Sequence, residues 1–192
     1  MNVVDRVKNI LINPKQEWPK IAAEPATVQS LYVGYIMILA AIGPLAIIIR
    51  GLSFGSALGL PYAIGMYLLS LVAVSIVALI VDLLAPTFGG QRDYVASLKL
   101  VAYAYTAVWI AGIFRLIPAV GGIIGLLAGI YSLYTFYLGA APVKKCPAEK
   151  AVGYTIIVLI CNIVLFWLLG LMVLPMMVGG GIAGLGTMGM MR

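Results

Sequence analysis

Five apolar stretches, separated by short polar segments, constrain this chain more than any other feature of its sequence. They cover residues 28–49, 61–84, 97–114, 118–141 and 151–174. A helix of about 20 apolar residues crosses the hydrocarbon core of a bilayer, because it satisfies its backbone amides internally. We therefore predict an all-α polytopic membrane protein in which five transmembrane helices form a bundle.

The composition excludes a soluble domain and leaves little material for catalysis. Hydrophobic residues make up 64% of the chain and charged residues only 9%, against about 25% charged residues in soluble domains. Histidine is absent and Asp and Glu number six, so acid–base groups and metal ligands are scarce. The two cysteines do not form a CxxC pair. We expect no enzyme activity, no catalytic residue, no metal site and no cofactor.

The polar segment of residues 1–27 is expected to form a cytosolic amphipathic lead-in. Its residues 3–12 have helical periodicity, and Asn13 with Pro14 ends the helix. The apolar face consists of Val3, Val7, Ile10 and Leu11, and the other faces hold Asp5, Arg6, Lys8 and Asn9. Trp18 follows among lysines, which suits either the lipid headgroup layer or a cap packed on the bundle.

A segment rich in glycine and methionine, residues 175–192, follows the predicted transmembrane domain of residues 28–174. Methionine thioethers can bind Cu(I), but the spacing here is irregular and the segment has no Cys or His. Apolar packing or disorder is therefore the favoured interpretation of this tail.

The distribution of basic residues predicts the orientation. With the N-terminus inside, the inner segments hold nine Lys and Arg residues and the outer segments hold three. The inner ones are Arg6, Lys8, Lys15, Lys20, Arg92, Lys99, Lys144, Lys145 and Lys150, and the outer ones are Arg50, Arg115 and Arg192. Cytoplasmic loops are rich in Lys and Arg, so we predict a plasma-membrane protein with its N-terminus in the cytoplasm and its C-terminus outside. Trp18, Lys144 and Lys145 are expected at the lipid interface.

Gly121, Gly125 and Gly129 follow one another at intervals of four residues in the fourth apolar stretch. This spacing puts them on one helix face, where the missing side chains let a second backbone approach closely. We expect the partner to be another helix of the same chain, because five helices are enough to cover the face. A helix of a second copy is the alternative.

Polar residues within the apolar stretches are the candidate functional residues. Asp82 is the only acid there, and a structural ion pair with Arg92 or Lys99 is favoured over an ion or proton site. Asn162 is expected to form an interhelical hydrogen bond. Four tyrosines on the cytoplasmic side are expected in an interfacial belt and in core packing, with a ligand-binding cluster as the alternative: Tyr103, Tyr105, Tyr131 and Tyr134.

An ordered set of short motifs resembles the Yip family of Rab-GTPase-interacting membrane proteins, in particular its bacterial and archaeal branch. The motifs are Gly89-Gly90, the pair Tyr103 and Tyr105, Ile117-Pro118, residues 131–139, the lead-in with Pro14 and Trp18, and the loop with Pro147, Glu149 and Lys150. One departure is Ala107, where members often carry a proline. The resemblance implies five spans and a cytosolic N-terminus.

Together these features predict a non-catalytic, membrane-organising or membrane-trafficking-like interaction module. Its expected partners are membrane lipids and either further copies of the chain or another membrane protein, and not nucleic acid. The alternative is a small transporter or channel with a path near Asp82 and Asn162.

Overall fold

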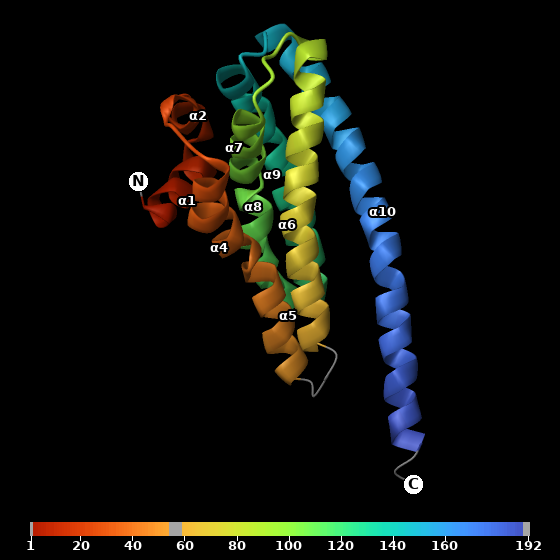
Figure 1. The fold of residues 1–192 in the computed structure, drawn as a ribbon. Helices are drawn as coiled ribbons and strands as arrows, with labels where there is room; N and C mark the ends of the chain where they lie inside the picture. The colour runs from red at the N-terminus through yellow and green to blue at the C-terminus, as the bar shows by residue number, and fades with distance from the viewer. Residues whose placement is uncertain (1, 54–58, 190–192) are drawn as a thin grey trace.

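The computed structural model describes the backbone of residues 2–53 and 59–189, and this part of the chain consists of helices and short connections (Figure 1). Five helical segments are long and apolar enough to cross a membrane: Val28–Ser53, Leu60–Phe88, Tyr94–Leu116, Ala119–Lys144 and Ala148–Leu171. Each overlaps one predicted stretch and differs from it by a few residues at its ends. The predicted all-α polytopic fold is therefore confirmed.

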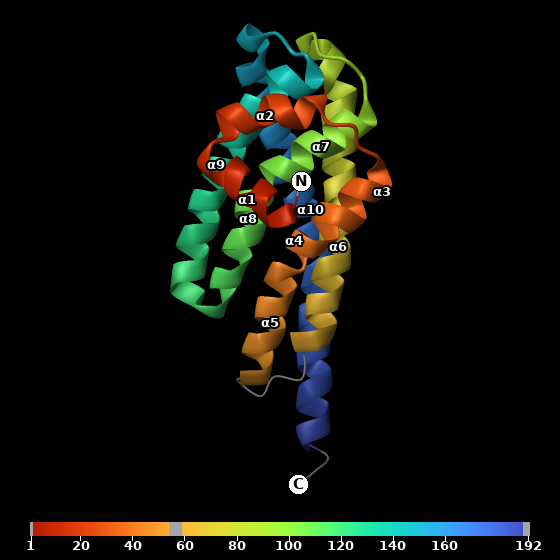
Figure 2. The ribbon, with the colours of Figure 1, turned by 90° about the vertical axis from the view of Figure 1, so that its left-hand side faces the viewer.

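The lead-in folds as two short helices, α1 (Val3–Ile12) and α2 (Pro14–Ala23). The predicted helix of residues 3–12 is confirmed, and Asn2 begins it by accepting a hydrogen bond from the backbone N–H of Val4. Pro14 occupies the first turn of α2, where its missing N–H costs nothing. Figure 2 shows both helices lying across the bundle, and we call this pair the cap.

The first span is a helix of changing pitch. It consists of α3 (Val28–Leu31), the π-helical turn η1 (Tyr32–Ile36), α4 (Met37–Ala40) and α5 (Ile42–Ser53). A capping box between Thr27 and Ser30 starts it. The second span is regular: α6 (Gly59–Leu84) ends in a 3₁₀ turn, η2 (Ala85–Phe88).

The third span lies at the centre of the bundle and is also interrupted. It consists of α7 (Tyr94–Ala104), α8 (Thr106–Ala111) and the 3₁₀ turn η3 (Gly112–Leu116), with a break at Tyr105. Its most apolar window is 61% buried, against 11% for the fifth span. Neighbouring helices therefore enclose the third span, whereas the fifth presents most of its surface to lipid.

The last two spans are α9 (Pro118–Lys144) and α10 (Ala148–Gly189). Pro118 opens α9 directly after η3, so the third and fourth spans form a tight hairpin at residues 115–118. α10 contacts α6, α9 and η2, and it diverges from the bundle toward Gly189 (Figure 1). Its backbone passes residue 175 as a helix; the side chains of the predicted tail, residues 175–192, lie outside the described part, as does Arg192.

Candidate functional site

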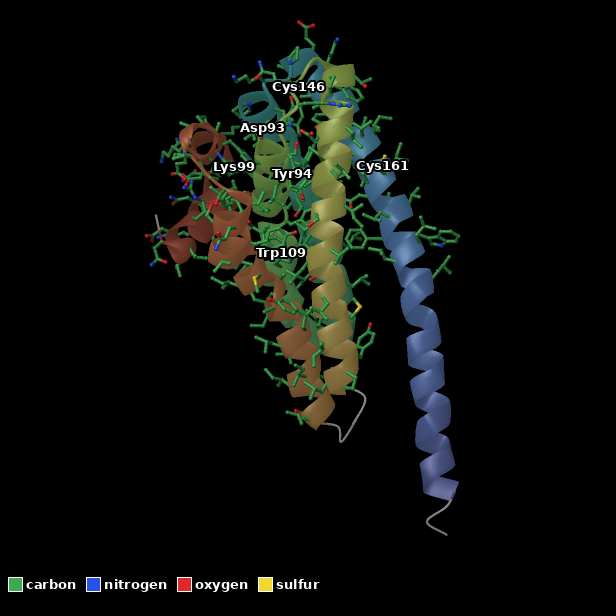
Figure 3. All side chains as sticks on the ribbon, in the orientation of Figure 1. Asp93, Tyr94, Lys99, Trp109, Cys146 and Cys161 are labelled. Atoms are coloured by element: carbon green, nitrogen blue, oxygen red, sulfur yellow. The ribbon has the colours of Figure 1, made fainter. Side chains whose placement is uncertain are left out.

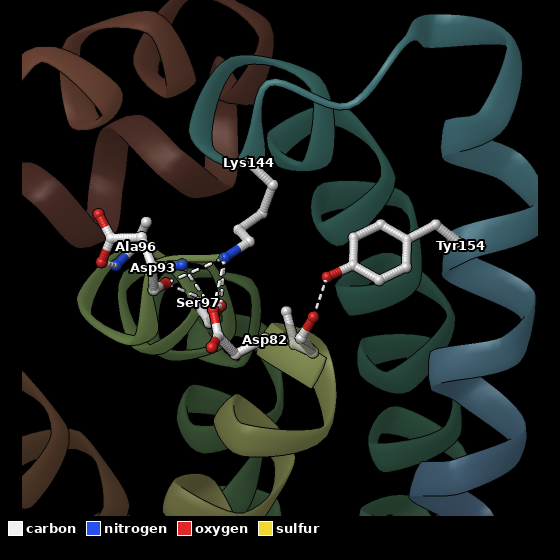
Figure 4. A network of polar contacts seen from close by, with 7 residues as sticks. Asp82, Asp93, Ala96, Ser97, Lys144 and Tyr154 are labelled. Atoms are coloured by element: carbon white, nitrogen blue, oxygen red, sulfur yellow. Dashed lines mark hydrogen bonds and ion pairs between the residues drawn. The ribbon is translucent and has the colours of Figure 1, made fainter. Parts of the chain in front are cut away.

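A buried lysine and a carboxylate from two different spans form the centre of a polar cluster at the cap end of the bundle (Figure 4). Lys144 Nζ donates hydrogen bonds to Asp82 Oδ1 at 2.9 Å, to Ser97 Oγ at 2.7 Å and to the Asp93 carbonyl at 3.0 Å. Asp82 Oδ1 also accepts from the Asp93 N–H at 2.7 Å and from the Ser97 hydroxyl at 3.1 Å. The cluster thus ties the end of α9 to α6 and to the start of α7.

The structure corrects the predicted partner of Asp82. The ion pair that was expected with Arg92 or Lys99 is formed with Lys144 instead. Lys99 Nζ donates to the carbonyl oxygens of Ile21 and Glu24, at 3.0 and 2.6 Å, and so holds the end of α2. Asp82 and Lys144 end the second and fourth spans, and the ends of two even-numbered spans lie on the same side of a membrane. That rule is the sequence signal that points to this pair.

The predicted position of Lys144 at the lipid interface is wrong. Its side chain is 0% exposed, because the carboxylate of Asp82 and the Asp93 carbonyl draw the ammonium group inward. Lys145 is exposed and adopts a left-handed backbone conformation that ends α9. Its predicted place among lipid headgroups stays a prediction.

A second buried charge holds the cap together. Arg6 is 4% exposed and pairs with Glu17, 2.6 Å from Nη1 to Oε1, and with Glu24. Its guanidinium also lies over the ring of Tyr103, 5.5 Å from the ring centre. The sequence placed Arg6 away from the apolar face of α1, and the structure buries it because α2 folds back and supplies the carboxylates.

Trp18 lies inside the molecule and not in the headgroup layer. It is 1% exposed, and its ring makes an edge contact with Tyr103 at 6.5 Å between ring centres. A Cβ added to Gly139 of α9 would come within 2.6 Å of the Trp18 ring. Of the two interpretations of this segment, the packed cap is confirmed and the lipid-interface position of Trp18 is wrong.

A cavity of about 610 Å³ lies deeper in the bundle, between helices of all five spans. Its lining is mostly apolar and includes Gly125, Gly129 and Trp109, with Tyr105 and Asn162 as polar members. Asn162 Nδ2 donates to the Tyr105 hydroxyl at 2.5 Å, so the predicted interhelical hydrogen bond is confirmed. Within the described residues, Asn162 Oδ1 and the hydroxyl of Ser132, which also lines the cavity, are buried without a hydrogen-bond partner.

The glycine face of α9 divides into two parts. A Cβ added to Gly121 would lie 2.5 Å from the Phe114 carbonyl oxygen, so this glycine lets η3 fold back on α9. Added Cβ atoms at Gly125 and Gly129 would meet nothing within 4 Å. The intrachain contact that was expected for the whole face is therefore found at Gly121 only, and the other two glycines face the cavity.

Two glycines that carry the family resemblance occupy positions where a larger residue would be strained or crowded. Gly89 has a φ of +74°, which favours glycine, and a Cβ at Gly90 would lie 3.1 Å from the Lys144 carbonyl oxygen. A comparison with family models matches the Yip1 domain over residues 8–170. The chain belongs to this family. Comparison with curated proteins and with solved structures found no match.

The four candidate tyrosines of this Yip1 domain lie in separate surroundings. Tyr103 packs under the cap, 4.6 Å from the ring of Tyr35, whereas Tyr105 lines the cavity. The Tyr131 hydroxyl donates to the Leu11 carbonyl at 2.7 Å and joins α9 to α1. Tyr134 is 43% exposed. The favoured interpretation of core packing fits Tyr103, Tyr105 and Tyr131, and the structure does not gather the four side chains at one site.

The two cysteines of the Yip1 domain are far apart and free, with Cys146 near the cap end and Cys161 on α10 (Figure 3). The Cys146 thiol donates to the Phe88 carbonyl at 3.2 Å, and burial raises the pKa of this thiol. A thiol with a raised pKa is a weak nucleophile at neutral pH. Among the side chains that the structure describes, no group of three or more His, Cys, Asp or Glu residues could hold a metal ion.

Proposed function

We propose that this Yip1 domain is a non-catalytic interaction module of the plasma membrane, with a membrane-organising or membrane-trafficking-like role. The proposal rests on one observation: the buried cationic side chains hold helices together. Arg6, Lys99 and Lys144 all bond to oxygen atoms that fix the cap or the end of the bundle. Their contacts fit a rigid scaffold, in which ionisable side chains hold helices together.

The outer surface of the cap is the part that such a module would present to partners. Lys8, Lys15 and Lys20 are exposed there, and so are Val4 and Ile12. A surface that combines basic and apolar side chains suits anionic headgroups, where each Lys or Arg contributes about 1 kcal/mol. Membrane lipids are therefore the first proposed partner, and a second copy or another membrane protein is the next.

The alternative, a transporter or channel with a path near Asp82 and Asn162, has weaker support. Asn162 lines the cavity, but Asp82 does not. Asp82 is instead held by Lys144, Ser97 and the Asp93 backbone. A path through both residues would have to break this cluster.

Flux measurements on proteoliposomes separate the two functions. We expect liposomes that contain the purified chain to lose a proton or potassium gradient no faster than protein-free liposomes. The Asp82→Asn variant, reconstituted to the same density, should behave in the same way. A flux that the wild type supports and Asp82→Asn abolishes would overturn the interaction module in favour of the transporter.

The proposed orientation places the cap in the cytoplasm and the C-terminus outside. Nine inner against three outer basic residues and an odd number of spans support it. Reporters that are active only on one side of the membrane, fused to either end, test it. We expect a cytoplasmic signal from the N-terminal fusion and an external signal from the C-terminal fusion, and signals from one compartment would contradict the orientation.

A further inference from the structure

The cavity opens toward the surrounding lipid between α9 and α10. Leu126 and Ile130 of α9 line it and are 67% and 58% exposed. Ile163 and Phe166 of α10 line it as well and are 60% and 50% exposed. Side chains that belong to both the cavity wall and the outer surface mark an entrance, so a molecule in the bilayer can reach the cavity sideways.

The apolar part of the cavity wall is about as deep as one lipid leaflet. The third span lines the cavity from Arg115 to Tyr105, which lie ten residues apart, or about 15 Å along the helix axis at about 1.5 Å per residue. The hydrocarbon of one leaflet measures about 15 Å, half of the bilayer core. Near Tyr105 the lining gains polar groups, from Ser132 and the pair of Tyr105 and Asn162. The size and depth of the apolar part match a lipid acyl chain.

The positive charge of Arg115 lies at the other end of this cavity wall. Arg115 lies in η3, at the turn that precedes α9, and it lines the cavity. Its guanidinium lies against α5, because a Cβ added to Gly43 would be 3.4 Å from Arg115 Nη1. Among the residues that the structure describes, Arg115 forms no ion pair.

No Asp or Glu side chain lies at this end of the bundle. The chain contains six acids. All six belong to the cap or to the cap end of the spans: Asp5, Glu17, Glu24, Asp82, Asp93 and Glu149. No acidic side chain of the chain is therefore placed to neutralise Arg115. At this depth the available anion is a lipid headgroup in the leaflet opposite the cap.

We propose that the cavity is a binding site for one lipid with an anionic phosphate headgroup, drawn from the leaflet opposite the cap. The phosphate binds the guanidinium of Arg115, and one acyl chain enters between α9 and α10 and lies along Gly125 and Gly129. The glycines make room for the chain, since a side chain at either position would occupy the cavity. The site depends on the membrane placement of the chain and not on which side of the membrane the cap occupies.

Lipid titration followed by native mass spectrometry of the full chain in detergent tests this site. The probes are phosphatidylglycerol and phosphatidylcholine with identical acyl chains. We expect the wild type to bind phosphatidylglycerol about fivefold more tightly, the equivalent of about 1 kcal/mol for one cation. Arg115→Gln should remove this preference. Arg50→Gln should retain it, because Arg50 is exposed at the same end but does not line the cavity.

Glycine variants test the acyl-chain part of the site. Gly125→Leu is expected to weaken binding of both lipids at least tenfold by filling the cavity, and Gly129→Leu provides an independent second variant. Gly122→Leu is the matched control, since an added Cβ is equally unhindered there but Gly122 does not line the cavity. Equal losses in Gly122→Leu and Gly125→Leu, or equal effects of Arg50→Gln and Arg115→Gln, would overturn the proposal. So would a wild-type dimer that Gly125→Leu converts to monomer with lipid binding unchanged, because a second copy would then occupy the cavity.

Discussion

Replacing Lys144 by methionine is expected to destabilise the chain by about 3–5 kcal/mol, the usual cost of removing one partner of a buried ion pair. The lysine side chain is 0% exposed and that of Asp82 is 14% exposed, so the remaining carboxylate has little access to water. The change also removes the hydrogen bonds that Lys144 donates to Ser97 and to the Asp93 carbonyl. Thermal unfolding in detergent, followed by circular dichroism, measures the loss.

Lys145→Met is the matched control, because Lys145 is adjacent in sequence but exposed. It should change stability by less than about 1 kcal/mol. The double variant Asp82→Asn with Lys144→Met should recover part of the loss, since it leaves no unpaired charge. If Lys144→Met and Lys145→Met have equal effects, the cluster does not hold α9 to α6 and α7, and the scaffold role of the buried charges loses its main support.

The features that could be predicted from the sequence are those that local patterns determine. Hydropathy over about 20 residues locates each span, because the bilayer imposes the length. Asn13 with Pro14 locates the end of α1, since proline cannot continue the hydrogen bonding of the preceding turn. The hairpin at residues 115–118 was predictable for the same reason.

The features that local patterns do not predict depend on contacts between distant segments. Lys144 lies 62 residues from Asp82, and Arg6 lies 18 residues from Glu24, so helical periodicity contains no information on either pair. Neither the π-helical turn at Tyr32–Ile36 nor the break at Tyr105 contains a proline, so the sequence gives no local signal for these two irregularities. The glycine repeat predicted close packing, but only the geometry of η3 decides that Gly121 packs while Gly125 and Gly129 face the cavity.

The replacement of Trp18 by alanine separates the two interpretations that the sequence left open for the cap. For a buried tryptophan, such a change costs about 3–5 kcal/mol, because the cavity that remains is only partly refilled. Trp18 is 1% exposed and packs against Tyr103 and α9, so we expect a loss in this range. The measurement is again thermal unfolding in detergent.

Trp167→Ala is the control for this experiment, since Trp167 on α10 is 65% exposed and faces the surroundings of the bundle. Its replacement should cost less than about 1 kcal/mol, because few protein contacts are lost. A tryptophan in the headgroup layer would behave like Trp167, as its contacts are with lipid and water. Similar losses for the two variants would therefore indicate that Trp18 lies at the lipid interface and that the cap does not pack on the bundle. A much larger loss for Trp18→Ala requires the cap to be part of the folded core.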